Sequence, residues 1–290
     1  MKDLLILLDV YWISIVVASF SGILLAQLGS HLAGRDQSLQ VFCLSQGALS
    51  GVLLGLLGIL SVGGQEALHA SVEGHSLVPS LAALGFAACL SLLLAKISRN
   101  LAESRNTIFI AIFICLISMN SLISRLFPAL EQQFSRVFFG NFTTASIHTL
   151  EILGLATLLL GGAYLKRWKT YAGETFEYAF FGFVHDRGSK LKRTVFEFSV
   201  LAYICLCIQT LGFVSTLALL FLPTVLVKSW NVSNIRNHLR AVSLLITIGV
   251  PSGFILSLVV PSLPTISVIV LMMGAIALLF TFVQSMKTLK

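Results

Sequence analysis

The sequence predicts an all-α, polytopic integral membrane protein, and three observations support this fold class. Hydrophobic residues make up 57% of the 290 residues and charged residues only 11%, whereas soluble globular domains carry roughly 25% charged residues. Apolar stretches long enough to cross a ~30 Å hydrocarbon core as helices recur along the chain. The alternating ~10-residue strands of a membrane barrel are absent from the sequence. We therefore exclude a soluble enzyme and a nucleic-acid-binding protein.

About nine transmembrane helices are expected, because backbone groups in lipid must find hydrogen-bond partners within their own segment. The third stretch shows the pattern, since it carries no charge before Lys96. The expected helices cover residues 10–33, 41–62, 77–96, 107–127, 145–164, 194–211, 213–228, 240–260 and 265–285. We expect them to form one transmembrane domain over residues 1–290.

Basic residues set the expected orientation of these helices. With the N-terminus outside, only Lys2, Arg125 and Arg136 of the 19 Lys and Arg residues lie on the outer side. Cytoplasmic loops of membrane proteins carry such an excess of basic residues. The sequence therefore predicts an N-out, C-in topology, and the net charge of +7 needs no polyanionic partner.

Small residues recur at four-residue spacing in the second expected helix, at Gly47, Gly51 and Gly55. Such spacing lets a neighbouring helix approach closely. Two interpretations remain open: the helix lines a transport pathway, or it is simply packed tightly.

The expected inner segment 165–193 is longer than a connector needs to be. Its first half is typical of a short amphipathic helix that basic clusters hold at the anionic inner leaflet. The segment either only connects two spans or docks a soluble partner, and its length favours docking. One side of this helix is expected to carry Phe176, Ala179, Phe180 and Phe183. Glu174 and Glu177 are expected to be exposed.

His148 and Glu151 are three residues apart, which places them on one face of the fifth expected helix. An ionisable pair within a membrane helix is a candidate functional site, so these side chains could hold a cation or a proton. The alternative is that both lie in the wet outer interface.

Catalytic motifs are missing from the sequence. It contains no G-x-x-x-x-G-K-[ST] phosphate-binding loop, no G-x-S-x-G elbow and no H-E-x-x-H helix. We expect a transport subunit that is not itself an enzyme and binds no cofactor. Any ATP and Mg would be bound by a partner subunit.

Short motifs follow one another in order along nearly the whole chain. They are Leu28-Gly29-Ser30, Leu44-Ser45-x-x-x-Leu49-x-Gly51, Phe138-Phe139-Gly140-Asn141, Gly188-x-Lys190-Leu191, Leu211-Gly212 followed by Leu222-Pro223, and Pro264-Thr265. In these motifs the chain resembles the integral membrane permease subunits of bacterial zinc/manganese/iron ABC importers.

The resemblance implies a multi-pass protein of the bacterial inner membrane that forms a pore with a second copy or a paralogous permease. Two cytoplasmic ATPase subunits would dock through the segment near residues 174–190, which includes Arg187, and drive alternating access. A periplasmic solute-binding protein would deliver the metal. The residues implied for the transport pathway are Phe42, Gln46, Gly47, Gly51, Asn141 and Gln209.

Four positions depart from the family pattern. Phe42 and Gln46 stand where the signature has an aspartate and a histidine, and Asn141 and Ser262 replace two further aspartates. Without these charges, a low-dielectric pathway loses most of its attraction for a divalent cation.

Several functions therefore remain open for the chain. It carries a metal whose ligands include His148 and Glu151, or it is a degenerate or repurposed permease that transmits ATPase motion without transporting metal. An ATP-independent transporter is disfavoured, because ionisable residues are scarce in the expected helix interiors. A membrane scaffold would bind another kind of partner through residues 165–193.

Overall fold

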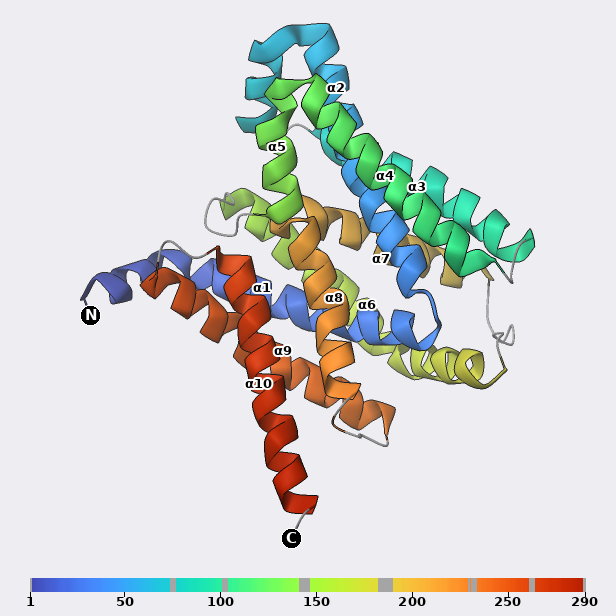
Figure 1. The fold of residues 1–290 in the computed structure, drawn as a ribbon, viewed down its shortest axis with the longest axis vertical. Coiled ribbons are helices and arrows are strands. Elements are labelled where there is room, and N and C mark those ends of the chain that lie inside the picture. Colours follow the sequence, from blue (N-terminus) through green and yellow to red (C-terminus); the bar gives the residue numbers. More distant parts are fainter. Residues whose placement is uncertain are drawn as a thin grey trace. The chain divides into compact units, whose positions relative to one another are not determined.

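The computed structural model describes residues 2–73, 77–100, 104–140, 147–181, 190–228, 230, 234–260 and 264–288. Ten α-helices and no strands occupy these residues (Figure 1). Eight of the helices are long and apolar enough to cross a bilayer. The expected all-α, polytopic membrane fold is therefore confirmed.

The chain separates into two compact units. The first comprises residues 1–36, 141–185 and 215–290, and the second comprises residues 37–140 and 186–214.

The first unit contains α1 (Lys2–Gly34), α6 (Ile147–Phe181), most of α8 (Phe213–Lys228), α9 (Ile235–Val259) and α10 (Thr265–Thr288). Helix α1 packs against α6 and α9, and α9 packs against α10. Small residues permit the closest approach, because a side chain at Gly29 of α1 would overlap the backbone carbonyl of Leu220 in α8.

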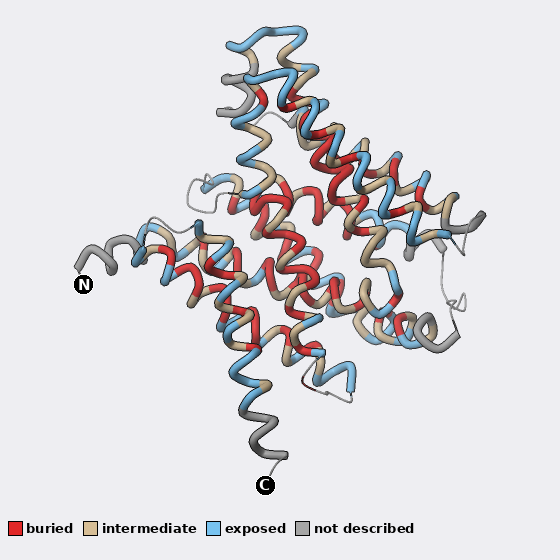
Figure 2. Tube along the Cα trace, in the orientation of Figure 1, coloured by how far each residue is buried: buried red, intermediate tan, exposed pale blue. Residues whose placement is uncertain are grey.

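The second unit contains α2 (Ser38–Glu73), α3 (Leu77–Asn100), α4 (Arg105–Leu126), α5 (Pro128–Phe139) and α7 (Lys190–Leu211). Helix α2 contacts all four of the others. Residues 45–53 of α2 are buried on every side, which places this stretch of the helix in the core (Figure 2).

Three element predictions differ from the structure. The expected span 213–228 is α8, a 16-residue helix about 24 Å long, which is shorter than the ~30 Å hydrocarbon core. Helix α5 was not predicted, because its sequence is amphipathic rather than uniformly apolar. Helix α2 continues to Glu73, past the expected end at residue 62, with a backbone break at Gly64 (φ 69°).

The prediction of a separate short surface helix within residues 165–193 is also wrong. Helix α6 runs without a break from Ile147 to Phe181, so the fifth expected span and the amphipathic stretch form one helix. Gly173, the glycine within the amphipathic stretch, does not end the helix, because its backbone is itself helical.

Candidate functional site

Helix α6 joins the fifth expected span to the expected coupling segment. Its 35 residues extend about 52 Å, whereas about 20 residues suffice to cross the hydrocarbon core. A helix of this length exceeds the core by about 20 Å.

A buried polar network connects the end of α1 to this part of α6. We call it the α1–α6 network, and its members are His31, Arg35, Tyr164, Tyr171, Glu174 and Thr175. His31 is fully buried, and its Nδ1 and Nε2 atoms lie 2.9 Å from Thr175 Oγ1 and 2.8 Å from Tyr164 OH.

The hydrogen-bond directions within the α1–α6 network follow from the single proton of Thr175. The Thr175 hydroxyl donates to the Tyr171 carbonyl at 2.8 Å, so it must accept from its other partners. His31 Nδ1 therefore donates to Thr175, and in a neutral imidazole Nε2 then accepts from Tyr164. Both imidazole nitrogens are satisfied, as a buried polar side chain requires.

Arg35 supplies the charge of this network. Its guanidinium forms a 2.9 Å ion pair with Glu174, and it also donates to the Tyr171 carbonyl at 3.3 Å. The guanidinium carbon lies 4.2 Å from the centre of the Tyr171 ring. Arg35 is only 2% exposed, so these contacts replace nearly all of its hydration. The predicted topology places Arg35 in an inner segment, and no sequence motif pointed to His31.

The predicted exposure of Glu174 in the coupling segment is wrong. Glu174 was expected to be exposed, but its side chain is 20% exposed and paired with Arg35. Phe176 is 57% exposed, and its predicted docking contact stays a prediction. Glu177 is half-buried. The reason is that α6 turns its Thr175 face towards α1. The side chains of Phe180, Phe183 and Arg187 lie outside the described residues.

In the second unit, the signature positions of α2 lie in an uncharged environment. Phe42 is half-buried and packs edge-on against Phe113 of α4, with ring centres 6.0 Å apart. Gln46 is fully buried, and within the part of the chain that the structure describes its amide has no hydrogen-bond partner. The same holds for Asn120 on α4, which packs against α2.

The glycines of α2 face α3. A methyl group at Gly51 would lie 2.6 Å from the Ala82 carbonyl oxygen, and one at Gly55 would lie 2.9 Å from the Ala82 side chain. A methyl group at Gly47 would meet Leu90. These contacts support tight helix packing, and a pathway role for Gly47 and Gly51 stays a prediction.

Of the three remaining predicted positions, the structure describes only Gln209. Gln209 on α7 accepts a 2.6 Å hydrogen bond from Ser80 on α3, so its amide ties two helices of the second unit together. Asn141 and Ser262 lie outside the described residues.

Two motif glycines far apart in the sequence meet in the second unit. Gly140 (φ 75°) follows α5 and Gly212 (φ 93°) follows α7. A side chain on either glycine would overlap the backbone of the segment that holds the other. Phe138 and Phe213 stack beside them, with ring centres 5.3 Å apart. The two motifs therefore form one close backbone contact.

The predicted metal ligands His148 and Glu151 are near each other on α6, with His148 Nδ1 3.8 Å from a Glu151 carboxylate oxygen. Their side chains are 68% and 66% exposed. The described residues contain no group of three or more His, Cys, Asp or Glu side chains that could hold a metal ion. Metal binding by this pair stays a prediction.

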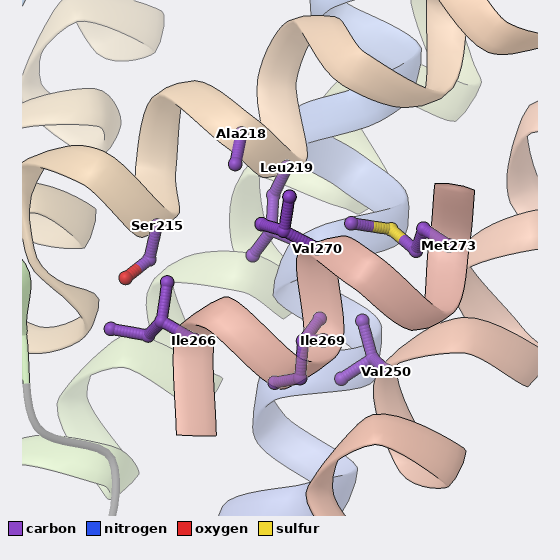
Figure 3. A pocket seen from close by; sticks show the side chains of 8 residues that line it. All are labelled: Ser215, Ala218, Leu219, Val250, Ile266, Ile269, Val270 and Met273. Carbon is purple, nitrogen blue, oxygen red and sulfur yellow. The ribbon is translucent and has the colours of Figure 1, made fainter. Parts of the chain in front are cut away.

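A small cavity between α8, α9 and α10 does not provide a binding site. It is lined by Ser215 and seven apolar side chains, including Leu219, Val250 and Met273 (Figure 3). Its volume is about 10 Å³, which is room for about one water molecule.

Replacing Gln46 with methionine is expected to stabilise the protein. The variant Gln46→Met removes a buried amide that has no hydrogen-bond partner among the described residues, which relieves a desolvation penalty of about 1–3 kcal/mol. The unfolding temperature in detergent should rise. Gln209→Met is the matched control, and it should lower the unfolding temperature because Ser80 loses its acceptor. If both variants lowered the unfolding temperature equally, the Gln46 amide would have a hydrogen-bond partner in the folded protein.

Comparisons with known proteins identify the fold but not a family. The sequence matches no protein-family profile and no curated protein. The fold is similar to a solved structure described as PsaBC from Streptococcus pneumoniae in complex with Fab. The superposition has a TM-score of 0.71 at 16% sequence identity and covers 96% of this chain and 94% of that chain. The expected resemblance to the metal-type ABC importer permease fold is confirmed at the level of the fold.

Proposed function

We propose that this chain is the membrane-spanning permease subunit of an ABC transporter of the zinc/manganese importer type. The observation that carries the proposal is the similarity of fold over 96% of the chain. The motif glycines add support, because Gly29, Gly140 and Gly212 stand where the backbone leaves no room for a side chain.

The proposed partners follow from what the chain lacks. It has no phosphate-binding loop, so a separate cytoplasmic subunit binds ATP and Mg and hydrolyses the nucleotide. A second copy or a paralogous permease completes the pore in the bacterial inner membrane. An external solute-binding protein delivers the cargo in the importer arrangement.

Helix α6 is the proposed lever between the ATPase and the membrane. Its end beyond the hydrocarbon core presents Phe176, which is 57% exposed, as a docking contact. Just before it, the α1–α6 network clamps α6 to α1 through an ion pair and buried hydrogen bonds. A displacement of the α6 end by the ATPase would therefore move α1 with it instead of bending α6 alone.

A substitution at the proposed docking contact tests this function. Phe176→Ala should weaken the association with the ATPase subunit about tenfold, and so lower the amount that co-purifies with the tagged chain, because loss of an aromatic interface contact worth ~1.4 kcal/mol changes an affinity by that factor. The measurement is the molar ratio of the two subunits after purification in mild detergent.

Phe198→Ala on α7 is the matched control, because Phe198 is 48% exposed and lies outside the proposed docking segment. It should leave the subunit ratio unchanged. An unchanged ratio for Phe176→Ala would contradict docking through the end of α6.

A second candidate function is a permease-like subunit that passes on ATPase motion without carrying metal. Phe42 and the buried amides of Gln46 and Asn120 favour it, because they provide no charge for a divalent cation. In vesicles that contain the complete complex, ATP hydrolysis without manganese or zinc uptake would support this candidate. Uptake that is lost in His148→Ala or Glu151→Ala would support metal transport.

A further inference from the structure

An open groove of about 460 Å³ lies in the first unit between α1, α6 and α9. Six of its lining side chains are polar, aromatic or charged, and the other two are leucines. The six are Gln27, Tyr164, Trp168, Arg236, Arg240 and Ser243. Neither the α1–α6 network nor the proposed ATPase contact uses Trp168, Arg236 or Arg240.

The charge of this groove is positive. Arg236 and Arg240 are four residues apart on α9 and therefore share one face of the helix, and both are exposed. Among the described residues that line the groove, none is acidic. The two arginines therefore present two positive charges to whatever occupies the groove.

Contacts between side chains hold parts of the groove lining in place. Gln27 Nε2 on α1 donates to Ser243 Oγ on α9 at 2.9 Å, and Ser243 donates to the Leu239 carbonyl at 2.8 Å. The Arg236 guanidinium carbon lies 5.8 Å from the centre of the Trp168 ring. One wall is thus tied across two helices, and one arginine is held against an aromatic face.

Exposed apolar side chains occur on the two helices that contribute most of the groove lining. Leu158 and Leu165 on α6 are each 71% exposed, and Leu244 on α9 is 54% exposed. All three lie within helices that are long and apolar enough to cross a bilayer. Trp168 stands about 20 residues into α6, which is the length that crosses a hydrocarbon core, and Arg236 stands in the first turn of α9. Aromatic and basic residues at such positions are typical of the interface between headgroups and acyl chains. An occupant that matches this setting has an anionic head and apolar tails.

We propose that this groove binds the headgroup phosphate of an anionic phospholipid. Guanidinium groups hold phosphate through paired, charge-assisted hydrogen bonds. Basic pockets between membrane helices are a known setting for such headgroups. The acyl chains lie along the exposed leucines of α6 and α9. Free phosphate has the same charged group but no apolar part that could contact these leucines.

Native mass spectrometry of the full chain tests this proposal. After delipidation in mild detergent, the chain is titrated with dioleoylphosphatidylglycerol, with dioleoylphosphatidylcholine, and with inorganic phosphate alone. We expect phosphatidylglycerol to bind about thirtyfold more tightly than phosphatidylcholine, because two interfacial arginines each favour an anionic lipid. Inorganic phosphate alone should give no stable adduct.

Charge-matched variants locate the site. Arg236→Gln/Arg240→Gln should abolish the preference for phosphatidylglycerol. Lys166→Gln/Lys169→Gln removes the same charge from exposed positions of α6 outside the groove, and it should keep the preference. Equal loss in both double variants would overturn the proposal in favour of general attraction to basic residues. Equal binding of both lipids, a phosphate adduct as stable as the lipid adduct, or a change only in the oligomeric state of the arginine variant would also overturn it.

Discussion

Arg35→Met is expected to lower the free energy of unfolding by about 3 kcal/mol, because breaking a buried ion pair by removing one partner leaves an uncompensated charge. Glu174 would lose its partner while only 20% exposed, and the Tyr171 carbonyl and Thr175 hydroxyl would each lose a donor. The measurement is reversible unfolding in mixed detergent micelles. In the assembled complex, the same variant should weaken the coupling of ATP hydrolysis to transport, since α6 would no longer be clamped to α1.

Two further variants separate the ion pair from a general effect of charge. Lys169→Met removes a positive charge from an exposed position of α6 and should change stability by about 0.5 kcal/mol or less. The double variant Arg35→Met/Glu174→Met should recover part of the loss, because it removes both charges. If Arg35→Met unfolds like the unmodified chain, the α1–α6 network does not stabilise α6.

Gly140→Ala is expected to be at least as damaging to the second unit. The backbone at Gly140 (φ 75°, ψ 162°) lies in a region that is essentially restricted to glycine and costs other residues about 1–3 kcal/mol. The added methyl group would also overlap the Leu211 carbonyl oxygen, and overpacking costs about 1–3 kcal/mol more. The yield of monodisperse protein after detergent extraction should fall sharply, together with the unfolding temperature.

Gly85→Ala on α3 is the matched control for Gly140→Ala. It makes the same chemical change in the same unit, but at a helical position with no neighbouring atoms within 4 Å. Alanine should be neutral there or stabilise α3 by up to ~1 kcal/mol. If the two variants behave alike, the contact between Gly140 and Gly212 is not a tight one.

Hydropathy predicted the membrane fold because the signal is local and strong. Each span is a run of apolar residues that can be recognised without its neighbours, and eight spans match helices of sufficient length. Helix boundaries were harder to predict. The polar part of α6 looked like a separate surface helix, because hydropathy changes at residue 165 although the backbone continues unchanged to Phe181.

The α1–α6 network could not be predicted from hydropathy, because its contacts are long-range. Arg35 and Glu174 are 139 residues apart, and a basic residue that follows an apolar run is usually a solvated loop charge. The one available signal was the pair His31 and Arg35, four residues apart near the end of an apolar helix. Two ionisable side chains on one face at that position indicate a polar partner on another helix.

The motif glycines differ from the α1–α6 network, because the sequence identified these residues but did not indicate their structural role. The resemblance singled out Gly140 and Gly212 in two separate motifs. Only the structure reveals that each glycine is needed because the other one is there. The role of the α2 positions Phe42 and Gln46 remains a prediction, because burial and missing hydrogen bonds define their surroundings without identifying a cargo.

Site-specific photo-crosslinking in the native cell tests the central claim most directly. A photoreactive amino acid replaces Glu177, on the part of α6 that extends beyond the length of a bilayer core, and a control chain carries it at Trp12, on the expected outer side. Our account predicts that position 177 crosslinks to a protein with a G-x-x-x-x-G-K-[ST] nucleotide-binding motif, and that position 12 does not. A position 177 that yields no ATP-binding protein, or that reacts with a membrane-impermeant reagent added outside the cell, would contradict the account.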